Sequence, residues 1–184
     1  MDPIETFAIT LQEAKKVLSS VGADQWTLPS PCAEWDVRGV VNHMTGGALM
    51  LAAGISGAPF AHVDDYIGDD PVGAFNAAGD AALSAIQADP SVLGRTVMMP
   101  FGEMPGAAIV GLMSNDEFVH AWDVARATGQ STDLHPELSE DRLAAVQAMM
   151  NPEFRKPGFF GPEMTAPDGA CAADRLAAFL GRAV

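Results

Sequence analysis

Histidine residues are the clearest candidates for chemistry in this chain, because the sequence contains no GxGxxG, Walker, HExxH or GxSxG motif. His120 lies within SNDEFVHAWD (residues 114–123), where Asp116 precedes it by four positions and Asp123 follows it by three. On a helix, these three side chains would continue the face that carries Ile109 and Met113. That face is expected to be buried, and an isolated buried charge costs several kcal/mol. We therefore expect the three side chains to be neutralised, paired or bound to a metal.

His43 supplies a possible third ligand from another helical segment. It shares a predicted helical face with glycines at positions 39, 46 and 47. Glycine within a helix costs about 1 kcal/mol relative to alanine, so these glycines indicate that space is needed for a neighbouring helix or for a bound metal and ligand. Two histidines and one carboxylate with open positions are typical of catalytic zinc and non-haem iron sites. The spacing equally allows a hydrogen-bonded Asp116–His120 pair in the core without a metal.

The other two histidines lie in predicted loops. His62 is part of the acidic segment HVDDYIGDD, and His135 precedes Pro136. We expect both to be solvated. The acidic segment lacks the DxDxDG register of a calcium-binding loop.

Composition excludes several classes of protein. The chain has 184 residues, with 10 lysines and arginines against 24 aspartates and glutamates, and a formal charge of −14. Such a surface repels phosphate backbones and anionic headgroups, so we expect neither nucleic acid nor a membrane as a partner. Cys32 and Cys171 are too far apart in sequence for a CxxC site or a disulfide framework. The N-terminus lacks the layout of a signal peptide, and the uncharged stretch 39–63 is interrupted by polar residues and glycines, so we expect a cytoplasmic protein.

Helical periodicity predicts an all-α fold. Apolar residues spaced by 4, 3, 4 and 3 positions from Phe7 to Val21 predict a first helix, closed by Gly22. Asp36 and Asp70 are expected to cap a second and a third helix. The later elements are expected to be a hairpin-like connection at 95–106, a long helix from Ala107 to Thr128 stopped by Gly129, a helix from Ser139 to Met150, an irregular stretch at 151–169 and a short helix from Cys171 to Leu180. Without a repeat or a linker, this pattern predicts one four-helix bundle domain over residues 1–184, with additional short helices.

Two histidine-containing segments carry a family resemblance. PCAEWDVR (31–38) followed by VNHM (41–44), and HAWDVARATG (120–129), resemble the two signatures of the DinB-like metal-binding family, which includes the N-terminal domain of mycothiol-dependent maleylpyruvate isomerase. The ending, with FGP at 160–162 and DRLAAFLGR at 174–182, is similar to a stand-alone, largely actinobacterial branch of that family. The resemblance implies a DinB-like four-helix bundle that holds a divalent metal.

Position by position, the resemblance implies that His43, Asp116 and His120 are the metal ligands. The isomerase has glutamate four residues before its second histidine, whereas this chain has Asp116 there and Glu117 beside it. Aspartate is one methylene shorter, so either the metal lies closer to the helix or Glu117 takes part; we favour Asp116. The isomerase also has a C-terminal domain for which this chain has no room, which weakens the transfer of its activity.

Several other residues are candidates for supporting roles. Asp123 could orient His120, since a ligating histidine usually donates its other N–H to an acceptor, or it could hydrogen-bond between helices. Trp35 and Trp122 could wall a pocket or simply fill the core. Cys32 is expected to pack before the second helix. The candidates for holding a substrate carboxylate are Arg38 and Arg126, although Arg126 also suits a helix C-terminus.

Taken with these residues, the resemblance implies a metal-dependent enzyme that acts with a low-molecular-weight thiol. In such a mycothiol-type transferase or isomerase, an open metal position binds the thiol and lowers its pKa for attack on an electrophile. The alternatives are a non-catalytic metal or small-ligand binding protein, which senses or stores, and a structural bundle without metal. Zinc is the expected metal, with nickel or iron also suited to the ligand set, and related bundles often form homodimers.

Overall fold

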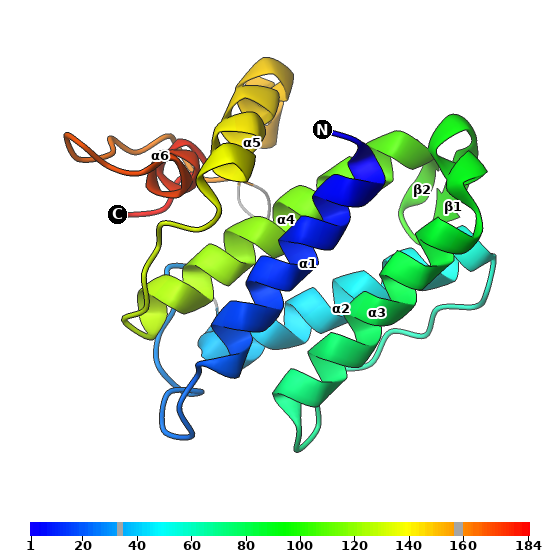
Figure 1. Cartoon of the computed structure of the whole chain (residues 1–184), viewed down its shortest axis with the longest axis horizontal. Coiled ribbons are helices and arrows are strands. Elements are labelled where there is room, and N and C mark those ends of the chain that lie inside the picture. Colours follow the sequence, from blue (N-terminus) through cyan, green and yellow to red (C-terminus); the bar gives the residue numbers. More distant parts are fainter. Residues whose placement is uncertain (33–34, 157–159) are drawn as a thin grey trace.

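Four helices surround one apolar core and confirm the all-α bundle. The computed structural model describes residues 1–32, 35–156 and 160–184. The four helices are α1 (Pro3–Ser19), α2 (Val37–Ser56), α3 (Pro71–Ala88) and α4 (Gly106–Ala127). Both α1 and α2 pack against α3 and α4, so each helix has two neighbours (Figure 1). Phe7, Phe75, Phe118 and Trp122 are among the largest fully buried side chains of this core.

Aspartate side chains begin three of these helices. Asp2 accepts hydrogen bonds from the backbone N–H groups of the first turn of α1, and Asp36 and Asp70 do the same for α2 and α3. The predictions at Asp36 and Asp70 are therefore confirmed. The prediction that Gly22 closes the first helix is wrong, because α1 ends at Ser19 and Ser20 is its C-cap. The stop at Gly129 is confirmed, since this glycine has φ 71° directly after the Thr128 cap.

A short hairpin separates α3 from α4, as expected. The 3-10 helix η1 (Pro90–Gly94) leads into strands β1 (Thr96–Met99) and β2 (Gly102–Pro105), which pair antiparallel. The hairpin then enters α4 at Gly106, where a Cβ atom would lie 1.8 Å from the carbonyl oxygen of Val92. Only glycine fits this junction, because the backbone at position 106 lies directly against the backbone of Val92. This close contact fixes where α4 begins.

The C-terminal elements lie on the side of α4 away from α3 (Figure 1). They are α5 (Pro136–Met149), the 3-10 turn η2 (Pro152–Phe154) and α6 (Ala172–Phe179). The helix predicted from Ser139 begins three residues earlier, because His135 has φ 30° and its Nδ1 accepts a hydrogen bond from the N–H of Leu138. The stretch predicted to be irregular contains only the short turn η2 in its described part, and residues 157–159 lie outside the described residues. Trp122 Nε1 donates to Asp174 Oδ1 at 2.8 Å and so ties α6 to α4.

Within the part of the chain that the structure describes, no helix has the length and apolar character needed to span a membrane.

Candidate metal centre

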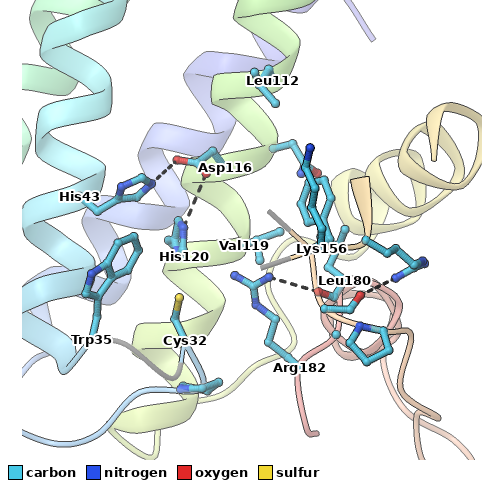
Figure 2. Close-up of a pocket in the computed structure, with 17 residues that line it drawn as sticks. Cys32, Trp35, His43, Leu112, Asp116, Val119, His120, Lys156, Leu180 and Arg182 are labelled. Atoms are coloured by element: carbon cyan, nitrogen blue, oxygen red, sulfur yellow. Dashed lines mark hydrogen bonds and ion pairs between the residues drawn. The ribbon is translucent and has the colours of Figure 1, made fainter. Parts of the chain in front are cut away.

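Three side chains from two helices converge beside the bundle core. His43 lies on α2, and Asp116 and His120 lie one turn apart on α4. His43 Nε2 is 3.1 Å from Asp116 Oδ2, and His120 Nε2 is 3.6 Å from Asp116 Oδ1. Figure 2 shows the two imidazole rings and the carboxylate pointing toward one another. The structure therefore brings together the three residues that the sequence predicted as ligands.

The separations of these donor atoms suit a divalent metal. Ligands about 2.0–2.1 Å from a tetrahedral zinc ion are about 3.3 Å apart. One atom from each of His43, Asp116 and His120 lies within 4.8 Å of the others. Nitrogen and carboxylate oxygen are the donors that zinc, iron and nickel accept. The donor set of this chain thus fits the metal that the sequence motifs imply.

The orientation of His120 is set by Asp123. His120 Nδ1 donates to Asp123 Oδ2 at 2.9 Å, while Nε2 faces Asp116 at a longer distance. The Asp123 carboxylate can only accept here, so it favours a proton on Nδ1; in the neutral imidazole the Nε2 lone pair is then directed at the cluster. Asp123 in turn accepts from the Arg182 guanidinium, at 3.0 Å from Nη2 and 3.3 Å from Nε.

Two carboxylates at the cluster are held in their charged form. Burial raises the pKa of Asp116, but the positive charge that His120 and His43 carry when protonated, together with the hydrogen bond from His43, outweighs it, so this pKa is lowered. Burial also raises the pKa of Asp123, and the hydrogen bond from His120 together with Arg182 reverses that effect. A charged carboxylate is the form that can bind a cation.

Trp35 forms an aromatic wall beside the histidines. Its ring stacks on His43 with centroids 4.6 Å apart and an interplanar angle of 28°, and it lies 5.7 Å from the His120 ring. Of the two tryptophans predicted as wall or core, Trp35 lines the cavity and Trp122 belongs to the core.

A cavity of about 610 Å³ opens onto the three converging residues. Its far side comes from the C-terminal segment, including Lys156 and Leu180 (Figure 2). Three of the chain's ten basic residues line it, namely Arg155, Lys156 and Arg182. Cys32 also lies on its wall, with Sγ within 4.8 Å of donor atoms of His120 and Asp123. Cys32 was expected to pack before α2, and the structure places it also at the cavity beside His120 and Asp123.

Glu117, the alternative carboxylate, lies elsewhere. Its side chain is 0% exposed, whereas the side chain of Asp116 is 30% exposed. Among the described residues, neither oxygen of Glu117 has a hydrogen-bond partner. Burial and the neighbouring charge of Asp116 raise the pKa of Glu117 well above its usual value.

The two arginines predicted to hold a carboxylate lie outside the cavity lining. Arg38 donates to Asp65 Oδ2 at 3.0 Å and to the Gly68 carbonyl at 2.9 Å, which fixes the loop before α3. Arg126 is exposed in the last turn of α4. The sequence did not predict that these two arginines lie away from the cavity, because both are close to the histidine motifs in sequence.

The glycines of α2 make room for side chains. A Cβ atom at position 46 would lie 2.6 Å from the Tyr66 ring, and one at position 47 would lie 2.8 Å from Met113 Cε. Close packing against neighbouring elements, one of the two uses of space predicted for these glycines, is therefore observed at positions 46 and 47. His62 is exposed as expected and lies 3.0 Å from the Tyr66 hydroxyl, whereas His135 is half-buried as the cap of α5.

The contribution of the C-terminal segment to the site was not predicted from the sequence. Arg182 contacts Asp123 across 59 positions, and no local spacing could reveal such a pair. Asn115 was also missed: it is 9% exposed, lines the cavity and directly precedes Asp116. The only signal in the sequence was the clustering of scarce basic residues in the segment from 155 to 182.

Comparisons with known proteins agree with the two histidine motifs. Residues 8–125 match the family described as the mycothiol maleylpyruvate isomerase N-terminal domain. Two uncharacterized proteins of Mycobacterium tuberculosis, from strains CDC 1551 / Oshkosh and ATCC 25618 / H37Rv, are each 38% identical over 185 residues, with 100% of both chains covered. No solved structure matches this chain.

Proposed function

Because the chain belongs to the family of mycothiol maleylpyruvate isomerase N-terminal domains, we propose that it is a metal-dependent enzyme that transfers or isomerises with the help of a small thiol. The observation that carries this proposal is the convergence of His43, Asp116 and His120 at a cavity of about 610 Å³. A buried structural site would need no such opening. Three protein donors also leave at least one position for an exchangeable ligand.

Each residue of the site would have a distinct role in binding the metal. His43, Asp116 and His120 hold the metal, and Asp123 keeps the Nε2 lone pair of His120 directed at it. When bound, a divalent metal such as zinc lowers the pKa of a thiol and stabilises the thiolate as a nucleophile at neutral pH. Zinc is the metal we propose, and nickel or iron also suit the ligand set.

The rest of the cavity would orient the thiol and its electrophilic partner. Trp35 presents a rigid apolar face beside the metal ligands, which restricts where a substrate can lie. Arg155, Lys156 and Arg182 concentrate three of the chain's ten basic residues at this cavity, in a chain whose formal charge is −14, and Arg155 also lies 3.6 Å from the Glu163 carboxylate. This charge distribution favours an electrophile that carries a carboxylate or another anionic group.

Cobalt substitution tests the proposal directly. The protein stripped of metal is titrated with cobalt(II), whose visible absorption reports coordination geometry, and then with mycothiol. We expect about one cobalt per chain and a new sulfur-to-cobalt absorption band when the thiol is added. The His43→Ala variant should lose the metal, whereas His62→Ala, which removes an exposed histidine outside the cavity, should keep it.

Two results would contradict the proposal in different ways. Failure of the wild-type protein to bind cobalt or zinc would remove the metal site altogether. Metal binding with a spectrum that stays unchanged at saturating mycothiol would instead favour a protein that senses or stores metal.

A further inference from the structure

Arg182, in the tail after α6, reaches the metal-facing histidine through a buried carboxylate. Its guanidinium donates to both oxygens of Asp123, from Nη2 at 3.0 Å and from Nε at 3.3 Å. Asp123 is fully buried, and the Arg182 side chain is only 11% exposed. Asp123 Oδ2 accepts from Arg182 and His120 at the same time. The three side chains therefore form one chain of hydrogen bonds that ends at the candidate metal centre.

A specific backbone turn aims Arg182 at Asp123. After α6, Gly181 adopts φ 95°, the N–H of Gly181 donates to the Ala178 carbonyl, and the N–H of Arg182 donates to the Ala177 carbonyl. This is the pattern of a Schellman motif, which requires a left-handed residue and therefore favours glycine. A Cβ atom on Gly181 would lie 2.7 Å from Gly161 Cα, so the turn also packs tightly against another segment. The position of Arg182 is consequently fixed by the fold of the tail.

The two parallel hydrogen bonds from Arg182 Nε and Nη2, here called the fork, fix the orientation of the Asp123 carboxylate and also compensate its charge. A guanidinium that binds both oxygens holds the plane of the carboxylate, which a single point charge does not do. With that plane fixed, Oδ2 stays directed at His120 Nδ1. If the carboxylate could rotate, His120 would lose the acceptor that keeps its proton on Nδ1.

We propose that Arg182 is a positioning residue for the metal centre: acting through Asp123, it keeps the Nε2 lone pair of His120 directed at the cluster with His43 and Asp116. Arg182 lies outside residues 8–125, the part of the chain that matches the family. The C-terminal segment thus completes a site whose ligands all come from the bundle. The functional meaning of this role rests on the proposed metal site, but the effect on His120 exists in the metal-free protein as well.

The first measurement is therefore made without metal. Two-bond ¹H–¹⁵N correlation spectra, recorded at a pH where the imidazole rings are neutral, distinguish the tautomers of each histidine. We expect wild-type His120 to show the Nδ1–H tautomer and Arg182→Ala to show an average of tautomers, while the His43 signals keep their pattern. An unchanged His120 pattern in a folded Arg182→Ala protein would overturn the proposal, whether or not the protein binds metal.

The second measurement is zinc affinity by competition with a chelator. Loss of an outer-shell partner typically lowers metal affinity about 10–100-fold. We expect a loss in this range for Asp123→Ala and about tenfold for Arg182→Ala. Because Arg182 acts through Asp123, the double variant should bind zinc as Asp123→Ala does; multiplied losses would show that Arg182 acts by another route.

Arg155→Ala provides a matched control in the same cavity. Arg155 is 20% exposed and donates to the carbonyls of Gly161 and Phe179, so it also fixes the C-terminal segment, but it does not contact Asp123. We expect Arg155→Ala to leave the His120 tautomer and the zinc affinity unchanged, and an equal loss there would reduce Arg182 to a general structural role. If Arg182→Ala does not fold, Arg182→Lys keeps the charge and removes the fork. It should then show a smaller tautomer change, and wild-type behaviour in that variant would refute the fork argument.

Discussion

Substitution of Glu117 tests how much a buried acidic side chain lowers the free energy of unfolding of this bundle. Its side chain is fully buried, and among the described residues neither carboxyl oxygen has a hydrogen-bond partner. Leaving a buried polar group without a partner costs about 1–3 kcal/mol. Glu117→Met keeps a side chain of similar length and removes both oxygens. We expect it to increase the free energy of unfolding at pH 8 by about 1–3 kcal/mol, or about 2–4 °C in Tm for each kcal/mol in a chain of this size.

The pH dependence follows from the direction of the pKa shift. Burial and the charge of Asp116 raise the pKa of Glu117 well above 4.5, so in the window above pH 4.5 the folded protein binds more protons than the unfolded chain. The free energy of unfolding therefore has a contribution that is fully present below the unfolded pKa and is lost as pH rises through the folded pKa. Glu117→Met and Glu117→Gln both remove this contribution. Their stability relative to wild type should accordingly be greater at pH 8 than at pH 5.

Urea unfolding at pH 5 and pH 8, with a chelator present, measures both effects. Glu103→Gln is the matched control, because Glu103 is exposed on β2 and substitutions at such sites usually change stability by no more than about 0.5 kcal/mol. A Glu117→Met protein that is less stable than wild type at both pH values would refute the reasoning. Such a result would mean that the Glu117 carboxyl has a stabilising partner.

Two further substitutions test the site and the fold. In a zinc titration against a chelator, Asp116→Ala should lose affinity as severely as His120→Ala, since each removes one of the three proposed protein ligands. Glu117→Ala should change affinity little, and the reverse ranking of the two carboxylates would assign the ligand role to Glu117 instead. Trp122→Phe should lower the free energy of unfolding by about 1.5–3 kcal/mol, because it removes the hydrogen bond to the Asp174 carboxylate that ties α6 to α4, and unchanged urea unfolding would show that this bond is dispensable.

Much of the fold was predictable because its signals are local. Asp36 and Asp70 cap helices through contacts three residues away, and Gly129 follows its helix directly. The proline and glycine residues of 95–106 likewise predicted the hairpin. The end of α1 was misplaced because Val21 continues the apolar spacing after the helix has ended; it packs against the core from the connection that follows. Spacing reports which side chains face the core, and a loop residue can satisfy it as well as a helical one.

The candidate site was predictable only where its residues share a helix or a motif. His43, Asp116 and His120 were identified in this way, and the structure brings them together. Arg182 was not, because its contact with Asp123 depends on the turn at Gly181 and on the packing of α6. Arg38 and Arg126 were predicted to hold a substrate because they are close in sequence to the histidine motifs, yet neither lines the cavity. Nearness in sequence does not fix the direction of a long side chain.

A helical wheel alone does not decide whether Asp116 or Glu117 is the carboxylate ligand on the buried helix α4. Helix α4 packs against α1 and α2 on one side and α6 on another, so most of its circumference is buried and both carboxylates lie on apolar faces. What separates them is access: Asp116 borders the cavity and is 30% exposed, whereas Glu117 faces the space beside Gly47 in the core. A ligand that must be deprotonated before it binds a metal favours a position where its charge is compensated. Two histidines lower the pKa of Asp116, and burial raises that of Glu117, so the electrostatics favour the same carboxylate as the geometry.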